Sequence, residues 1–252
     1  MQFLKGVERK LRQWRNNLSP VFYRGDKRFC PCCQGAYSKF LSAGTKERAR
    51  DDAVCPFCRS RERDRLLMLL FNKRFSELFE SEKHLLHFAP EPCITKFLSG
   101  LPGVTYVTTD LIRDDVSFKA DIQSLDIADA SYGGVICAHV LQDVPDEAAA
   151  MREVLRVLQP GGWALFSVPL RGAVTRECDQ PMNARAAWDK RPNEHIRVYG
   201  LDFADRLQSF GFEVEVIEGK SFFSTPDALV KHGLANDVFT NVLFFCRKPK
   251  EG

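Results

Sequence analysis

Four cysteines in two short clusters have the clearest chemistry in this sequence. Residues 30–33 read Cys-Pro-Cys-Cys, and residues 55–58 read Cys-Pro-Phe-Cys. Two such turns can each direct two thiolates toward one point, and four thiolates complete a tetrahedral Zn²⁺ site with no open position. The spacing therefore predicts a structural zinc ribbon over residues 30–64. Its expected ligands are Cys30, Cys33, Cys55 and Cys58, with Cys32 as the competitor if the register of the first turn differs.

Further site residues must be positioned by the elements that begin at residue 84. From there, short apolar segments alternate with helical ones, which is typical of a mostly parallel sheet covered on both faces. Strands are expected near 84–88, 104–109, 117–120, 134–138, 162–168, 212–218 and 241–247. The clearest helix covers 147–159, and Pro160-Gly161-Gly162 is expected to end it. In such sheets, ligands bind beyond the carboxyl ends of the strands, where strand order reverses.

The composition fits one medium-sized α/β domain with a small appendage. Of 252 residues, 44% are hydrophobic and 27% are charged, which excludes a disordered chain. The first residues lack an uninterrupted apolar stretch, and no segment approaches the roughly 20 apolar residues of a membrane span. We therefore expect a cytoplasmic protein. In such a compartment, paired cysteines indicate metal binding rather than disulfides.

The N-terminal region is basic, because residues 1–65 hold 16 Lys and Arg against 7 Asp and Glu. RNA, an anionic membrane and a phosphorylated substrate are all suitable partners for such a region. Residues 1–29 predict a basic amphipathic helix followed by a linker. The helix can lie peripherally on a membrane, contact RNA phosphates, or dock its apolar face on the remainder of the chain. A second helix is expected after the ribbon, over residues 65–83, and it begins among arginines.

One segment resembles a known family. Residues 139–170, HVLQDVPDEAAAMREVLRVLQPGGWALFSVPL, are similar to the region around strands four and five of class I S-adenosylmethionine (SAM)-dependent methyltransferases, in particular the type 11, ubiquinone-biosynthesis-like group. The C-P-x-C pair and EHIRVYG at 194–200 further resemble a branch with an N-terminal zinc ribbon. The resemblance implies a Rossmann-like α/β fold whose seven strands are ordered 3-2-1-4-5-7-6, the last one antiparallel.

The same resemblance implies a methyltransferase domain over 84–252, with insertions 171–194 and 219–240 that cover the substrate. SAM is the implied cofactor. Asp110, at the end of strand two, would bind the ribose hydroxyls, although an aspartate there can also cap a helix. Asp121 would accept the adenine amine while Ile122 packs on the ring, although Asp121 can also form a turn. The full set of implied cofactor-binding residues is Ala89, Pro90, Glu91, Asp110, Leu111, Asp121, Ile122 and Ala138.

The first loop departs from the family pattern. Members of the family usually follow strand one with an acidic residue and a glycine-rich turn, because glycine lets the backbone approach the ligand. Here the sequence is LLHFAPEPC, which places His87 at the acidic position and Ala89, Glu91 and Cys93 at the glycines. The helix N-terminus that follows would still attract the SAM carboxylate, and Glu91 its ammonium. This loop also supports a third interpretation, a non-catalytic scaffold.

Two histidines are candidates for the general base that removes a proton from a hydroxyl acceptor. His139 lies just beyond strand four and His195 lies in EHIRVYG. Each has a structural alternative, since His139 can be a packed hinge residue and His195 can orient a lid. Glu194 and Arg197 would hold the substrate, and Tyr199 would stack on it or form a hydrogen bond with it.

The end of strand four also bears on the acceptor. It reads Ala138-His139-Val140-Leu141 and lacks the Asn/Asp-Pro-Pro-aromatic pattern of adenine and glutamine methyltransferases. The favoured acceptor is a hydroxyl of a small molecule, a sugar or a lipid-linked glycan. The alternative is RNA, bound through the basic N-terminal region. The sequence does not indicate an oligomeric state.

Overall fold

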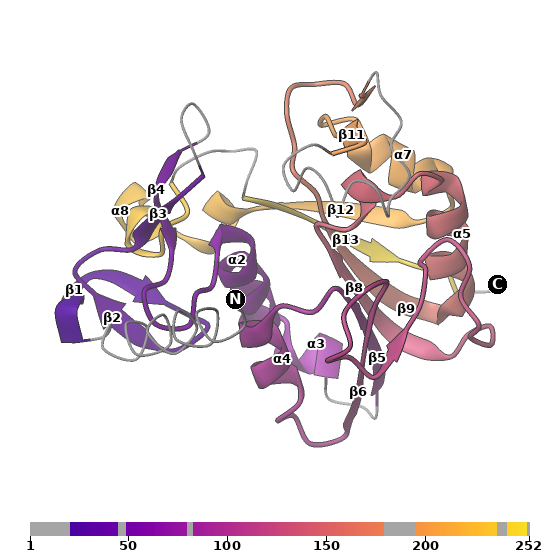
Figure 1. The fold of residues 1–252 in the computed structure, drawn as a ribbon, viewed down its shortest axis with the longest axis horizontal. Helices are drawn as coiled ribbons and strands as arrows, with labels where there is room; N and C mark the ends of the chain where they lie inside the picture. Colours follow the sequence, from indigo (N-terminus) through magenta and orange to yellow (C-terminus); the bar gives the residue numbers. More distant parts are fainter. Residues whose placement is uncertain (1–20, 45–48, 80–82, 179–194, 236–240, 251–252) are drawn as a thin grey trace, which may run out of the picture. The chain divides into compact units, whose positions relative to one another are not determined.

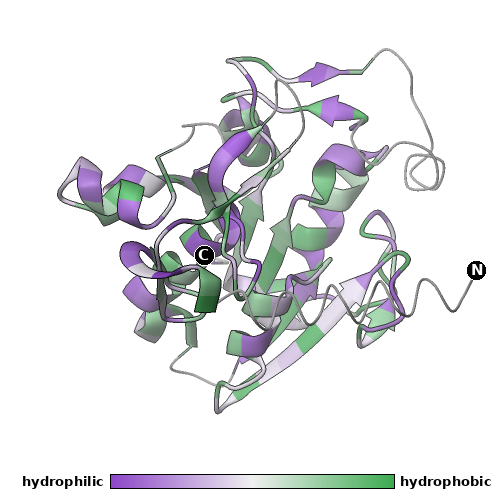
Figure 2. Cartoon of the chain, turned by 60° about the vertical axis from the view of Figure 1, so that its left-hand side comes forward, coloured by the Kyte–Doolittle hydropathy of each residue, from purple (hydrophilic) through white to green (hydrophobic). Residues whose placement is uncertain are grey.

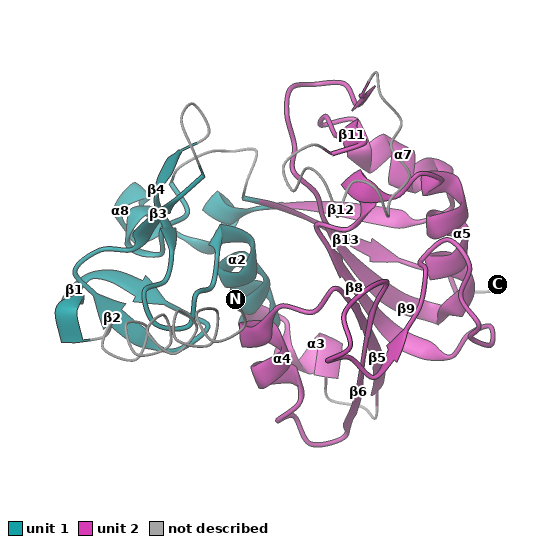
Figure 3. Ribbon diagram, in the orientation of Figure 1, with its two compact units in different colours: residues 1–72, 218–241 teal, residues 73–217, 242–252 magenta. Residues whose placement is uncertain are grey.

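The structure is a computed structural model that describes residues 21–44, 49–79, 83–178, 195–235 and 241–250. It divides into two compact units, one formed by residues 1–72 and 218–241 and the other by residues 73–217 and 242–252 (Figure 3). The helix expected near the start of the chain falls on residues 1–20, outside the described residues.

A seven-stranded sheet forms the centre of the second unit, and its strands match the predicted ones closely (Figure 1). The strand order is β12-β13-β9-β8-β5-β6-β7, and β13 runs antiparallel to β9. Numbered along the chain, this is 3-2-1-4-5-7-6, so the predicted topology is confirmed. The strands are β5 (Lys83–Phe88), β6 (Val104–Asp110), β7 (Phe118–Lys119), β8 (Tyr132–Ala138), β9 (Leu158–Ser167), β12 (Glu213–Glu218) and β13 (Val242–Arg247).

The strand order reverses beside β5. This strand pairs in parallel with β6 on one side and with β8 on the other, so that Phe88 lies opposite both Thr109 and Cys137. The carboxyl ends of these three strands therefore meet at one edge of the sheet. A ligand pocket is expected at this edge.

Aromatic contacts show that both faces of the sheet are covered. On β9, the side chains of Trp163 and Phe166 point to opposite faces, since successive residues of a strand alternate. The Trp163 ring lies 6.4 Å from that of Phe79 in α3 (Phe75–Phe79), whereas the Phe166 ring lies 6.4 Å from that of Phe203 in α7 (Phe203–Ser209). Double coverage explains why every residue of β8 is buried.

The helix predicted before strand five begins as expected but ends earlier. In α5 (Glu147–Val157), the N-cap Asp146 accepts a hydrogen bond from the amide of Ala149 at 2.8 Å. The prediction that Pro160 and the following glycines end this helix was wrong. Leu158 is already extended and pairs with Tyr132 of β8, so strand pairing ends the helix first.

The helices of both units carry hydrophilic and hydrophobic residues together, which is typical of helices with one buried face (Figure 2). Among the described residues, none of the helices is both long enough and apolar enough to span a bilayer.

The first unit is built from short hairpins and helices. Its elements are β1 (Arg24–Cys30), β2 (Gly35–Tyr37), β3 (Leu41–Ala43), β4 (Arg50–Val54), α2 (Glu62–Lys73), the 3-10 helix η3 (Gly219–Phe222) and α8 (Pro226–Lys231). The ribbon therefore starts with β1, ahead of the predicted boundary at residue 30. The helix expected over 65–83 is two helices, α2 and α3, separated at Arg74. This interruption lets the Arg74 guanidinium pack over Phe245, 4.9 Å from the ring centre.

A buried arginine joins the ribbon to a distant part of the chain. Arg65 of α2 has no exposed surface, and its guanidinium packs over Phe40 at 4.6 Å. All three guanidinium nitrogens donate to backbone carbonyls within 2.8–3.3 Å. The acceptors are the carbonyls of Asp52, Ala53, Ser60, His232 and Gly233.

These bonds explain why the units divide the chain differently from the predicted domains. The segment 219–240 was expected to belong to the methyltransferase domain as a substrate cover, whereas it forms part of the first unit. The carbonyls of His232 and Gly233 are bonded to Arg65 of α2, and α8 contacts β1. A role for this segment in covering the substrate stays a prediction.

Replacement of Arg65 by methionine tests this join. The variant leaves the carbonyls without their donor, so we expect the first unit to lose roughly 3 kcal/mol of stability. Amide hydrogen exchange should then accelerate in both 50–60 and 226–234. Arg63→Met is the matched control, since Arg63 forms a partly exposed ion pair with Asp64 at 3.4 Å and its removal should cost below about 1 kcal/mol. Unchanged amide exchange in residues 226–234 would contradict the conclusion that Arg65 holds this segment.

Candidate zinc centre and cofactor pocket

The four predicted cysteine ligands come together in the first unit. The sulfurs of Cys30, Cys33, Cys55 and Cys58 all lie within 4.8 Å of one another. Cys30 Sγ is 3.6 Å from Cys58 Sγ, and Cys33 Sγ is 3.8 Å from Cys55 Sγ. Zinc–sulfur bonds of about 2.3 Å in a tetrahedron place the sulfurs about 3.8 Å apart. The cluster therefore fits a zinc ion.

The two cysteine turns share one backbone feature. The residue after each second ligand, Gln34 or Arg59, has a positive φ of 57° or 64°, which turns the chain back on itself. Ser60 Oγ lies 3.1 Å from Cys30 Sγ and 3.2 Å from Cys58 Sγ, where a hydroxyl can donate to metal-bound thiolates. The four sulfurs that lie within 4.8 Å of one another are those of the predicted register. Cys32 is not one of these four, and its Sγ donates to the carbonyl of Asp64 at 3.5 Å.

A pocket opens at the carboxyl edge of the sheet in the second unit. The loop after β5 contributes Phe88 and Ala89. The chain after β6 contributes Asp110 and Leu111, and the turn after β7 contributes Asp121 and Ile122. The chain after β8 contributes His139, Val140, Asp143, Val144 and Pro145. Apolar walls with a few convergent polar groups are typical of small-molecule sites.

Both candidate cofactor carboxylates line this pocket, and both also bind their own loops. Asp110 is buried, and its Oδ1 accepts hydrogen bonds from the amides of Ile112 and Arg113 at 2.8 and 2.9 Å. Asp121 accepts from the amide of Gln123 at 2.9 Å and from its side-chain nitrogen. The turn-forming alternative for Asp121 therefore coexists with its place in the pocket. Ile122 is buried and lines the same pocket.

The remaining residues implied for the cofactor do not all reach the pocket. Ala89 lines it with a positive φ of 48°, and its amide donates to the carbonyl of Thr109 at 2.8 Å. Pro90, Glu91 and Ala138 are buried and are not among the residues that line the pocket.

Of the two candidate bases, His139 lines the pocket and His195 contacts Asp143, a carboxylate that lines it. His139 lines the pocket with a positive φ of 55°, and its amide donates to the carbonyl of Ser167 at 2.7 Å. His195 Nδ1 is 3.0 Å from Oδ1 of Asp143, which lines the pocket. The other carboxylate oxygen of Asp143 accepts from Gln142 Nε2 at 2.9 Å. The Gln142–Asp143–His195 chain orients the imidazole with its Nδ1 toward the carboxylate.

Comparison with known proteins identifies the family of this chain. A family model described as "Methyltransferase domain" (Methyltransf_23) matches residues 47–216, more than half of the chain. The chain belongs to this methyltransferase family. The sequence resemblance to methyltransferases is thereby confirmed.

Two curated relatives match parts of this chain. A Mycolicibacterium smegmatis protein named "Probable S-adenosylmethionine-dependent methyltransferase" is 30% identical over 112 residues, which cover 44% of this chain and 40% of that protein. The ubiquinone biosynthesis O-methyltransferase of Paracidovorax citrulli is 26% identical over 154 residues, which cover 57% of this chain and 59% of that protein. The chain thus spans about half the length of these relatives.

Among solved structures, a chain from a complex of the Haloferax volcanii Trm112 methyltransferase activator with a methyltransferase is similar. It matches with a TM-score of 0.49 and 14% identity, covering 74% of this chain and 91% of that chain.

Two of the three residues predicted to bind substrate, Arg197 and Tyr199, contact the segment that follows β8. Tyr199 is fully buried and Arg197 is 4% exposed. Arg197, in β11 (Arg197–Val198), forms an ion pair with Glu177 of β10 (Arg176–Glu177). Its Nη atoms donate to the carbonyls of Leu141, Val144 and Pro145 at 3.3–3.4 Å. Glu194 lies outside the described residues.

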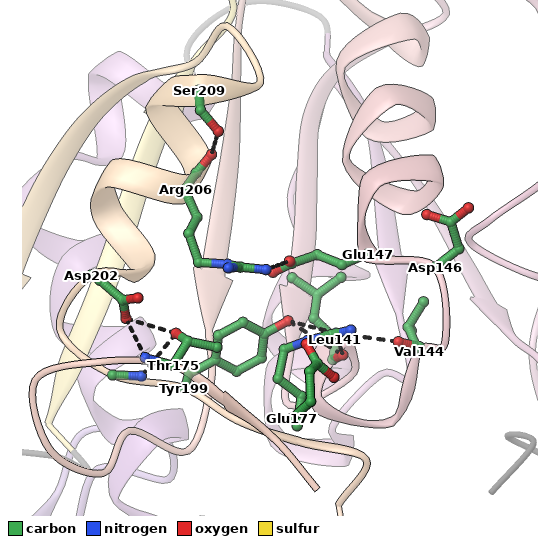
Figure 4. A network of polar contacts seen from close by, with 12 residues as sticks. Leu141, Val144, Asp146, Glu147, Thr175, Glu177, Tyr199, Asp202, Arg206 and Ser209 are labelled. Carbon is green, nitrogen blue, oxygen red and sulfur yellow. Dashed lines mark hydrogen bonds and ion pairs between the residues drawn. The ribbon is translucent and has the colours of Figure 1, made fainter. Parts of the chain in front are cut away.

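Figure 4 shows this network around the segment that follows β8. The hydroxyl of Tyr199 donates to the carbonyl of Leu141 at 3.4 Å, and burial raises the pKa of Tyr199, so it stays protonated. Next to it, Arg206 of α7 forms an ion pair with Glu147, the first residue of α5. Arg197 and Tyr199 thus hold the loop that follows β8, and their contact with substrate stays a prediction.

Sequence reasoning missed Gln142, Asp143 and Glu177. Asp143 sits in the 3-10 helix η2 (Leu141–Asp143), directly after the strand-four segment. Its position within HVLQDVP was a usable signal, because polar residues beyond a parallel strand are candidate site residues. Its partner His195 is 52 residues away in the chain, so only the fold reveals the pair.

Zinc content tests the metal centre. We expect about one zinc ion per chain in the purified protein, and Cys33→Ser should lose it because three thiolates leave the tetrahedron incomplete. Cys32→Ser is the matched control and should keep its zinc, since Cys32 is not one of the four clustered cysteines. Metal analysis by mass spectrometry measures both. A zinc-free wild-type protein would rule out the site.

Calorimetry tests the prediction that the Asp110 carboxylate binds the ribose hydroxyls of SAM. Asp110→Asn keeps an oxygen for the two backbone amides but removes the charge, so SAM should bind roughly 10- to 100-fold more weakly. Asp114→Asn is the control, because this side chain in the same loop is 92% exposed. Equal SAM affinity in both variants would show that Asp110 does not bind the ribose.

Proposed function

We propose that the chain is a SAM-dependent methyltransferase that methylates a hydroxyl group of a small molecule, a sugar or a lipid-linked glycan. The observation that carries this proposal is the His195–Asp143 pair beside the pocket, 3.0 Å apart. A hydroxyl acceptor needs a general base, and a histidine whose Nδ1 faces a carboxylate presents Nε2 for that task.

The pocket residues fit the cofactor. Asp110 would accept the ribose hydroxyls, Asp121 would accept the adenine amine, and Phe88, Ile122 and Val140 offer apolar surface for the base. SAM supplies an activated sulfonium methyl group. The chain's own residues have to align the acceptor and exclude water.

The proposed reaction is a nucleophilic displacement. Bound SAM would supply the methyl group to the acceptor oxygen, with its sulfur as the leaving group. His195 Nε2 takes the hydroxyl proton. Asp143 stabilises the resulting imidazolium, and Gln142 holds Asp143 in place.

The relative named as a ubiquinone biosynthesis O-methyltransferase supports an oxygen acceptor. The basic character of residues 1–65 favours a second candidate, RNA, with the first unit as its binding surface. Salt-dependent binding of RNA to the purified protein would favour this candidate. A non-catalytic scaffold is the third candidate and would bind no SAM.

Replacement of the base tests the mechanism. His195→Gln should lower the turnover number by about 100-fold or more, because proton removal is lost. Its SAM affinity should stay within about twofold of the wild-type value. Asp143→Asn should act in the same direction, since it leaves the imidazole without its carboxylate. Turnover is measured as S-adenosylhomocysteine released with a panel of phenolic and sugar acceptors.

The exposed His84 of β5 provides the matched control, and His84→Gln should keep wild-type turnover. Wild-type turnover in His195→Gln would remove His195 as the base, with His139 next to be tested.

A further inference from the structure

The first pocket loop has a backbone shape that its residues disfavour. Ala89 has a φ of 48°, in the left-handed region where a Cβ crowds the backbone and glycine is preferred. The sequence Ala89-Pro90-Glu91 contains no glycine. Other interactions must therefore hold this loop in its pocket-lining shape.

A series of hydrogen-bonded side chains, of which His87 and Glu91 are buried, is attached to the loop. His87 has no exposed surface, and its Nε2 donates to the carboxylate of Glu91 at 3.0 Å. Its Nδ1 is 2.7 Å from the hydroxyl of Tyr106 on β6, which in turn is 3.1 Å from Oγ1 of Thr95 in α4 (Pro92–Leu98). These hydrogen bonds connect β5 to the loop that follows it. They also connect β5 to the neighbouring strand β6 and to helix α4.

Glu91 is buried beside His87, where its carboxyl group needs hydrogen-bond partners. Glu91 is 8% exposed, and a buried carboxylate is costly unless it is hydrogen-bonded. Since a carboxylate can only accept hydrogen bonds, the imidazole must be the donor in the His87–Glu91 pair. Burial also raises the pKa of Tyr106, which keeps its hydroxyl protonated beside His87.

A second tether links this loop to the proposed ribose carboxylate. Arg113 Nη1 donates to the carbonyl of Pro90 at 2.8 Å, while the Arg113 amide donates to Asp110 Oδ1 at 2.9 Å. The loops after β5 and β6 are therefore joined through one residue. Their shapes are set together before any ligand enters.

We propose that His87 is a positioning residue whose hydrogen bonds to Glu91 and Tyr106 replace the glycine-rich turn and preform the cofactor loop. The inference rests on SAM being the cofactor. A glycine-rich loop reaches its shape through backbone freedom, whereas this loop is held by side chains. Such preorganisation lowers the entropic cost of ligand binding.

The test uses Tyr106→Phe, which removes one hydroxyl from the chain and leaves the ring. The ligand-free variant should exchange its Ala89 amide hydrogen at least tenfold faster than the wild type. Its SAM dissociation constant, measured by calorimetry, should rise about tenfold. The buried Tyr132 at the start of β8 provides the matched control, and Tyr132→Phe should change neither quantity.

A rescue variant separates positioning from general destabilisation. Glycine adopts a positive φ freely, so Ala89→Gly placed in the Tyr106→Phe background should recover part of the lost SAM affinity. Failure of this rescue, or wild-type exchange at Ala89 in Tyr106→Phe, would overturn the inference. Absence of SAM binding by the wild-type protein would refute the proposed function instead, while the exchange measurement would still decide whether the side chains hold the loop.

Discussion

The reversal of strand order at β5 is the constraint on which the pocket depends. β5 lies between β6 and β8, and the helices that follow β5 and β8 cover opposite faces of the sheet (Figure 1). The loops after these strands therefore diverge and leave a crevice at the carboxyl edge. Phe88, Asp110 and His139 meet there although they are far apart in the sequence. The position of the site thus follows from topology, and its chemistry from the residues that end the strands.

Arginine side chains hold the irregular segments of this chain. Arg65 binds carbonyls of the ribbon and of the segment near residue 232, and Arg197 binds carbonyls of the loop after β8. Arg113 does the same for Pro90. Loops lack the regular partners of helices and strands, so their carbonyls need other donors. A guanidinium carries five N–H groups in a fixed plane, so one side chain can satisfy several carbonyls at once.

The first unit combines this device with a metal. One apolar cluster of this unit contains two of the predicted cysteine ligands themselves, Cys30 and Cys55, beside Tyr37 and Phe40. A zinc ion held by these cysteines would add folding energy to this part of the unit. Phe40 also packs under the Arg65 guanidinium, so the metal cluster and the arginine stabilise adjoining parts of the same structure.

The sequence by itself determined the positions of the strands, the four clustered cysteines and the pocket residues Asp110, Asp121 and His139, because periodicity, cysteine spacing and position after a strand are local patterns. The order of the strands in the sheet followed from the family resemblance. Only the tertiary structure decided which groups pair across long separations. It joined His195 to Asp143 and buried Arg197 behind the pocket. Burial and side-chain partners depend on packing between distant segments, which no local pattern records. For the same reason, the glycine-free first loop was recognised as unusual, but the side chains that hold it were not.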